Sequence, residues 1–299
     1  MLALLALVTL ASPPPPSPIE ARIAERLRRF EGVMGVAAVH LGTGEGIFVD
    51  ADRRFPTASA IKTAILVEAY HQIAAGRLRK DRLVTLADDV KVGGSGVLHG
   101  MRAGSQWSVG DLLYLMIALS DNTATNMLVA LVGTKNVDAR MEAYGLRETR
   151  LYRPTFRGGH PDVFPEEERE YGLGSSTPRE TARLMEAIAR GKAVSREASA
   201  EMKALLGKQQ DHDMIPRLLP TDGTVEFAGK SGTDEEKLAD ASGLKGAVRV
   251  DSGIVTTKSG EYVIAIFTRR VKDGRWSVDN DALTTGAEVS RMVFDHFIR

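Results

Sequence analysis

The chain of 299 residues contains no cysteine. It therefore has no disulfide, no thiol nucleophile, no cysteine-ligated metal and no lipidated cysteine as a membrane tether. It also lacks a net charge, because 39 Lys and Arg balance 39 Asp and Glu, and its six His show no metal-ligand spacing. We therefore expect neither nucleic acid nor an anionic membrane as partner, and no metal or other cofactor.

The sequence has no apolar run long enough to cross a bilayer at its N-terminus. The apolar run from Leu2 to Ala11 is too short to span, and it ends in the small-residue spacing that export peptidases recognise. We predict a signal peptide at 1–11 and a proline-rich spacer at 12–18, and so an exported protein, periplasmic or secreted. Because no Lys or Arg precedes the run, a miscalled start or a short retained anchor stays an alternative.

The hydrophobic pattern predicts an α/β lobe made from both chain ends, with a helical lobe inserted between them. The α/β lobe is expected at 19–58 and 200–299, and the helical lobe at 59–199. Helices are predicted at Ile19–Phe30, Ser59–Ala75, Ser108–Leu119, Thr123–Val132, Val137–Tyr144, Pro178–Arg190 and Ala287–Ile298. Strands are predicted at Val33–Leu41, Gly46–Val49, Val225–Gly229, Lys245–Thr257 and Tyr262–Arg269, the first two as a hairpin. We expect the active site in the cleft between the lobes.

Ser59-Ala60-Ile61-Lys62 is a candidate for nucleophilic catalysis. The spacing puts Lys62 on the helical face of Ser59, about one turn away. Serine needs a base to remove its proton, and burial lowers the pKa of a lysine far enough for that task. The motif is weak alone, since a serine before a helix is usually an N-cap and a second S-x-x-K begins at Ser242.

Two further tripeptides follow along the chain. Ser120-Asp121-Asn122 ends an apolar helix, where it would otherwise be only a turn between helices. Lys230-Ser231-Gly232 follows a predicted strand, whereas its twin, Lys258-Ser259-Gly260, fits a hairpin turn. In this order, S-x-x-K, S-D-N and K-S-G resemble the class A β-lactamases and their penicillin-binding relatives, over about residue 19 to the C-terminus.

The resemblance implies a β-lactamase/DD-peptidase-like fold, in which an antiparallel sheet is flanked by terminal helices and carries the inserted helical domain. It implies that Ser59 attacks a lactam carbonyl and that Lys62 takes the proton. Ser120 would pass a proton to the leaving nitrogen, and Lys230 would keep the site positively charged. The expected partner is a β-lactam or a peptidoglycan-like acyl substrate, bound by a monomer.

Substrate-binding residues follow from the same resemblance. Asn122 would bind the acyl side-chain amide, while Ser231, Gly232 and Thr233 would line the strand edge. The backbone N–H groups of Ser59 and Thr233 would form the oxyanion hole. Arg249 is a candidate for the substrate carboxylate.

The chain departs from the family at the step that releases product. Class A enzymes carry a deacylating Glu just after a T-R-L-x-R stretch, which here is 149–153, and counting on places Thr155 at that position. The loop's usual Asn likewise falls on Gly159. Glu168 or Glu170 is a candidate replacement, although a solvated acidic loop explains both.

Three functions stay open at this point. The first is a class A-like β-lactamase, a serine hydrolase that hydrolyses β-lactam amides through an acyl-enzyme. The second, favoured by the missing Glu, is a penicillin-binding D-Ala-D-Ala carboxypeptidase or an esterase with slow or no lactam turnover. The third is a catalytically idle binding protein, which is disfavoured because all three motifs are present.

Overall fold

The computed structural model describes residues 15–156 and 164–298. The signal peptide predicted at 1–11, the first part of the spacer at 12–18 and the predicted loop position Gly159 lie outside these residues. The division into lobes by residue range stays a prediction. Across the described residues, no helix is both long and apolar enough to span a membrane.

A five-stranded antiparallel sheet forms the centre of the fold, with the strand order β2-β1-β10-β9-β8. Its strands are β1 (Val33–His40), β2 (Gly46–Val49), β8 (Val225–Glu235), β9 (Ala247–Thr257) and β10 (Gly260–Arg269). β1 and β2 form the predicted hairpin. β8 is longer than predicted, because the Lys230-Ser231-Gly232 motif continues the strand and pairs with β9 throughout. The motif therefore lies on an edge strand.

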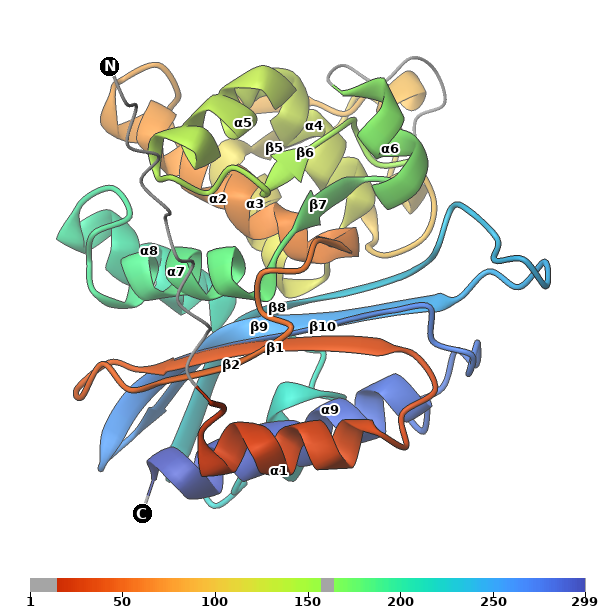
Figure 1. Ribbon diagram of the computed structural model, residues 1–299. Helices are drawn as coiled ribbons and strands as arrows, with labels where there is room; N and C mark the ends of the chain where they lie inside the picture. Colours follow the sequence, from red (N-terminus) through yellow and green to blue (C-terminus); the bar gives the residue numbers. More distant parts are fainter. Residues whose placement is uncertain (1–14, 157–163, 299) are drawn as a thin grey trace, which may run out of the picture.

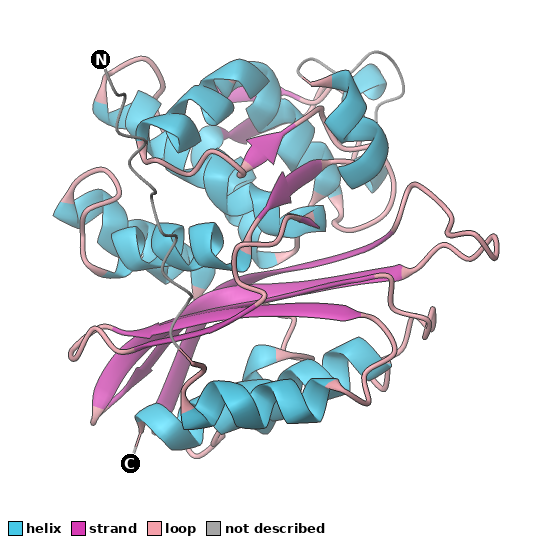
Figure 2. Cartoon of the chain, in the orientation of Figure 1, coloured by secondary structure: helices cyan, strands magenta, loops and turns pink. Residues whose placement is uncertain are grey.

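Both faces of this sheet are covered. On β10, Val263, Ala265 and Phe267 pack into one apolar cluster, whereas the alternating residues Tyr262, Ile264 and Ile266 pack into another. Helices α1 (Pro18–Leu27) and α9 (Asp281–Phe297), from the two chain ends, lie together on one face (Figure 1). Helix α7 (Pro178–Ala189) packs on the other face, with α8 (Arg196–Leu206) beside it against β8, and most of the remaining helices lie beyond these two (Figures 1 and 2). The antiparallel sheet with flanking terminal helices is confirmed.

The helical part contains α2 (Lys62–Ala74), α3 (Val109–Ala118), α4 (Asn122–Val132), α5 (Thr134–Ala143), α6 (Pro165–Tyr171) and α8 (Arg196–Leu206). Short 3-10 turns are η1 (Ala58–Ile61), η2 (Asp88–Val90), η3 (Leu98–Gly100) and η4 (Ile215–Leu218). There are also two small sheets. One has the strand order β3 (Phe55–Pro56), β7 (Gly174–Ser176), β6 (Arg150–Leu151), and the other pairs β4 (Leu83–Thr85) with β5 (Gln106–Ser108). Neither α6, α8 nor these small sheets was predicted.

The helix predicted from Ser59 begins instead as the 3-10 turn η1, and α2 starts at Lys62. Ten of the thirteen residues of α2 are buried, so this helix runs through the core of the helical lobe. η1 packs against β8 and β9. The start of a buried helix and an edge strand thus meet, and this meeting positions the site.

Candidate active site

Ser59 lies on η1, where the helical lobe meets the sheet. The preceding residue, Ala58, has a φ of +44°, a left-handed conformation that is strained for a residue with a Cβ. The facing strand comes very close, because a Cβ on Gly232 would lie 2.6 Å from the Thr57 carbonyl oxygen and 2.9 Å from the Ser59 nitrogen. Only glycine allows this approach.

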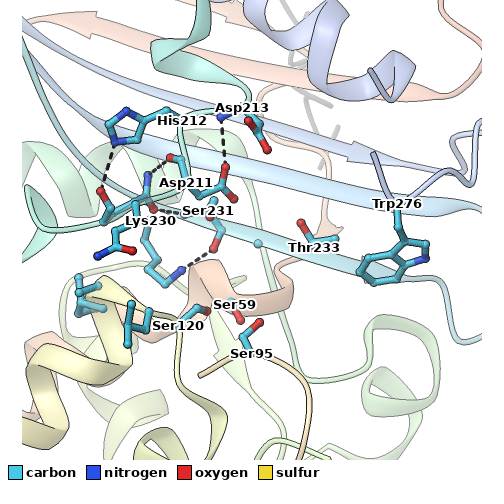
Figure 3. A pocket seen from close by; sticks show the side chains of 16 residues that line it. Ser59, Ser95, Ser120, Asp211, His212, Asp213, Lys230, Ser231, Thr233 and Trp276 are labelled. Atoms are coloured by element: carbon cyan, nitrogen blue, oxygen red, sulfur yellow. Dashed lines mark hydrogen bonds between the residues drawn. The ribbon is translucent and has the colours of Figure 1, made fainter. Parts of the chain in front are cut away.

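A cavity of about 410 Å³ opens at Ser59 and is lined by residues of two further motifs, Ser120 and Lys230. We call it the motif cavity (Figure 3). A second cavity, of about 300 Å³, shares Ser59 but extends toward the Arg153–Phe156 segment, and we call it the loop cavity. The structure therefore brings the three motifs together around one serine.

Lys62 is fully buried beneath this cavity. Its Nζ donates to the Ser120 carbonyl oxygen at 2.7 Å, to Ser120 Oγ at 3.0 Å and to Asn122 Oδ1 at 2.9 Å. Burial lowers the pKa of Lys62 well below its usual value, and the nearby charge of Lys230 lowers the pKa further. The lowered pKa favours the neutral amine, which can accept a proton.

The Ser120-Asp121-Asn122 turn is held by an N-cap. Asp121 caps α4 by accepting from Ala124 N at 2.8 Å, and its other oxygen accepts from Val97 N and Leu98 N. Ser120 has a φ of +53°, which again is strained backbone at a candidate site. The cap fixes this strained turn so that Ser120 and Asn122 both meet Lys62.

Lys230 supplies a second buried cation. Its side chain is 1% exposed, and its Nζ donates to the Ser231 carbonyl oxygen at 2.9 Å. Burial lowers the pKa of Lys230 to about 8, against the raising effect of the Asp211 and Asp251 carboxylates. Asp251 is buried on the adjacent strand, opposite Ser231, and its pKa is raised by burial and by Asp211 to about 8.

The outer edge of β8 offers backbone donors to the cavity. Ser231 N points away from β9, because it donates to the side-chain oxygen of Gln209 at 2.7 Å. Strand geometry repeats every two residues, so Thr233 N lies on the same outer edge. Gly232, between them, contacts the backbone of Ser59. The N–H groups of Ser59 and Thr233 can therefore lie on one side of a bound carbonyl group.

Thr155, at the position of the family's deacylating Glu, lines the loop cavity together with Ser59. The Asn126 side chain clamps its backbone, accepting from Thr155 N at 2.7 Å and donating to the Thr155 carbonyl oxygen at 3.0 Å. Within the described residues the buried Thr155 Oγ1 has no hydrogen-bond partner. Asn126 thus fixes the Thr155 backbone beside the loop cavity, and the threonine hydroxyl at this position is not a general base.

The two candidate carboxylates on the loop lie elsewhere. Glu168 forms an ion pair with Arg153 at 2.7 Å, and Glu170 forms one with Arg269 at 3.3 Å. Neither lines the motif cavity or the loop cavity. The geometry therefore does not favour either as the deacylating base.

Arg249 was expected to bind the substrate carboxylate, but its side chain does not face either cavity. It is buried and lines neither cavity. Its guanidinium donates to the carbonyl oxygens of Asp234, Val248 and Arg275 at 2.9 to 3.1 Å. The geometry does not favour Arg249 as a ligand of the substrate carboxylate.

Several residues of the site escaped the sequence reasoning. Gln209 fixes the edge of β8, Asn126 clamps Thr155, and Trp276 lines both cavities. Only Trp276 carried a signal, as one of two tryptophans in the chain. The part of the chain that the structure describes contains no cluster of three or more His, Cys, Asp or Glu side chains suited to a metal ion.

The comparisons with known proteins agree with this geometry. The model of the beta-lactamase enzyme family matches residues 18–297. The chain belongs to this family. The predicted class A-like serine β-lactamase family and its fold are thereby confirmed.

Individual relatives cover the chain to different extents. A β-lactamase from Streptomyces fradiae is 31% identical over 141 residues, so the alignment spans 44% of this chain and 46% of that enzyme. The crystal structure of a β-lactamase from Sphaerobacter thermophilus DSM 20745 has a TM-score of 0.77 and 29% identity, covering 93% of this chain and 96% of that chain. A PBP-A mutant in an acyl-enzyme complex with penicillin G has a TM-score of 0.78 and 26% identity, covering 95% and 99%.

Proposed function

We propose that this family member is an exported serine hydrolase that is acylated at Ser59 by β-lactams. One observation carries the proposal: Ser59, Ser120 and Lys230 line one cavity, and the buried Lys62 amine contacts Ser120 beneath it. The arrangement joins a nucleophile, a base with a lowered pKa and a second buried lysine that is positively charged below about pH 8. It needs no metal or cofactor for acyl transfer.

Acylation would use these groups in sequence. Neutral Lys62 has two N–H donors, for the Ser120 carbonyl oxygen and Asn122 Oδ1, and a lone pair that can accept the Ser59 proton. As Ser59 Oγ bonds to the lactam carbonyl carbon, the carbonyl oxygen becomes negative between the N–H groups of Ser59 and Thr233. The C–N bond then breaks, and Ser120 Oγ protonates the leaving nitrogen while Lys62 returns a proton to Ser120.

Binding would rest on the two cavities. Lys230 would attract the substrate carboxylate into the motif cavity, beside Ser231 and Gly232. Asn122, which lines the loop cavity, would face the acyl amide. The substrate is thus a small molecule with a carboxylate on its leaving-group side, and we expect the protein to bind it as a monomer.

The lack of a carboxylate suited to deacylation favours a second candidate function. Thr155 cannot act as a base, and Glu168 and Glu170 are each engaged by an arginine. A long-lived acyl-enzyme is therefore expected, as in a penicillin-binding D-Ala-D-Ala carboxypeptidase or an esterase. The PBP-A relative seen as an acyl-enzyme with penicillin G carries glutamate in place of a leucine.

A pre-steady-state experiment separates the two candidates. A chromogenic cephalosporin is mixed with excess and with stoichiometric protein, and the product released in the first turnover is compared with the steady rate. A β-lactamase gives many turnovers, whereas a penicillin-binding peptidase gives a burst of about one product per protein and little more. A Ser59→Ala variant should show neither, and a burst in that variant would contradict the proposal.

A further inference from the structure

Trp276 is an exposed aromatic residue at the mouth of the site. Its side chain is 67% exposed, and it lines both the motif cavity and the loop cavity. Figure 3 shows the ring beside Thr233, at the end of the motif cavity away from His212. A large ring left in water at this point has a surface to offer a ligand.

The loop that carries Trp276 is braced from within the fold. The preceding carbonyl group, of Arg275, accepts from Arg249 Nη2 at 2.9 Å and from Asn280 Nδ2 at 3.0 Å. Asn280 is fully buried and also donates to the Asp273 carbonyl oxygen at 2.7 Å. Two buried side chains therefore hold the backbone beside an exposed ring.

Arg249 supports the ring as well as the backbone. Its guanidinium carbon lies 5.1 Å from the centre of the Trp276 ring, within the range of a cation–π contact. The indole Nε1 donates to Oε1 of Glu235, at the end of β8, at 3.3 Å. Arg249 thus joins β9 to the Trp276 loop, and the ring is contacted by Arg249 and by Glu235.

The loop cavity that Trp276 lines is suited to an uncharged group. Its Arg153 pairs with Glu168, and its Lys237 pairs with Asp234 at 3.0 Å. Phe156, 63% exposed, supplies a second aromatic ring to the same cavity. With these cations paired, the two rings supply apolar surface for a substrate side chain, and the Glu235 carboxylate, which also lines the cavity, is engaged by the Trp276 indole.

We propose that Trp276 contacts the acyl side chain of the substrate and selects apolar, aromatic side chains, and that Arg249 is a positioning residue that holds Trp276 in place. This inference rests on the proposed acylation at Ser59. It names a substrate class, aromatic acyl donors, for the loop cavity. It also gives the buried Arg249 a role that does not require contact with the substrate.

The test compares two penicillins that differ by one ring. Benzylpenicillin and 6-acetamidopenicillanic acid share nucleus and amide, but only the first carries a phenyl group. We expect Trp276→Ala to lower the second-order rate constant for acylation by benzylpenicillin roughly ten-fold, and by the acetamido compound about two-fold or less. Trp276→Phe should retain most of the preference. Val278→Ala, an exposed apolar residue of the same loop that lines neither cavity, is the matched control.

Arg249 is tested through the mobility of the ring. In a Trp107→Phe background Trp276 is the one remaining tryptophan, so its fluorescence anisotropy reports on the loop. We expect Arg249→Met to lower that anisotropy and to reduce the preference for benzylpenicillin, and Arg249→Lys to restore part of both. Unchanged anisotropy together with an unchanged preference would overturn the positioning role.

The outcomes separate this inference from the proposed function. If Ser59 is acylated but the Trp276→Ala variant has the wild-type acylation rate constants with both penicillins, the inference is wrong and the proposed function stands. If Ser59 is not acylated, the proposed function fails. The Ser59→Ala, Trp107→Phe variant is then titrated with both compounds. A saturable change in Trp276 emission with benzylpenicillin alone supports the inference, and the absence of any change overturns it.

Discussion

Gly232→Ala tests the contact between the strand and the nucleophile. The new Cβ would lie 2.6 Å from the Thr57 carbonyl oxygen, 2.9 Å from Ser59 N and 3.0 Å from Ala60 N, all of them backbone atoms. Ordinary contact begins at 3.4 Å, so β8 and η1 must separate by about 0.8 Å, the difference between 3.4 and 2.6. No flexible side chain can absorb that movement.

The same movement separates the two proposed oxyanion donors, Ser59 N and Thr233 N. Donors act within a narrow window of about 2.7–3.1 Å from the oxyanion, so a shift of this size takes one of them out of range. We expect the acylation rate constant to fall by about 10²–10³. Overpacking should also lower the free energy of unfolding by about 1–3 kcal/mol.

Stopped-flow labelling with a fluorescent penicillin measures the acylation rate, and thermal unfolding measures stability in the same samples. Gly100→Ala is the matched control, since a Cβ there meets no atom within 4 Å. The control should label at the wild-type rate. A folded Gly232→Ala variant that also labels at that rate would refute the proposed role of the close contact between β8 and η1.

The remaining predictions concern deacylation and pH. Thr155→Glu places a carboxylate where Asn126 clamps the backbone, so we expect hydrolysis of the benzylpenicilloyl-enzyme to accelerate on the order of 100-fold. Thr155→Val should give no gain. Equal lifetimes of the acyl-enzyme in the Glu and Val variants would count against residue 155 as the place for a deacylating base. The acylation rate should fall as the pH rises through about 8, because Lys230, whose pKa is lowered to about 8, loses its charge there. Lys230→Arg keeps the charge, so its pH–rate profile should stay flat through that range, and an unshifted profile would exclude Lys230 as the titrating group. On the acid side the rate should rise with pH as Lys62, whose pKa is also lowered, becomes neutral.

Much of this fold could be predicted because its signals are long and regular. β10 carries a continuous apolar run, β9 is rich in Val and Ile, and the terminal helices carry a clear helical period, so all four elements are predicted. The largest shift is at α9, which begins at Asp281 rather than at the predicted Ala287. α6 and α8 were missed because they are short or mostly polar. The extension of β8 through Lys230-Ser231-Gly232 was missed because pairing with β9, rather than local preference, makes those residues a strand.

The residues of the site also fall into those that the sequence predicts and those that it does not. The order of the three motifs predicted that Ser59, Ser120 and Lys230 share a cavity, because each motif lies next to a recognisable helix or strand. Arg249 was predicted as a substrate ligand from its place on a strand, but sequence does not show where a long side chain ends. Its guanidinium turns to three carbonyl groups instead. Gln209 and Asn126 act through hydrogen bonds to distant backbone, which leave no local pattern.

The central claim is that Ser59 is the acylated nucleophile. The most direct measurement is the intact mass of the full chain after brief exposure to benzylpenicillin, followed by peptide mapping of the adduct, with Ser59→Ala alongside. The account predicts one added penicillin per protein, located on Ser59 and absent from the variant. An adduct on another residue, an equal adduct on Ser59→Ala, or neither adduct nor turnover in the wild type would contradict it.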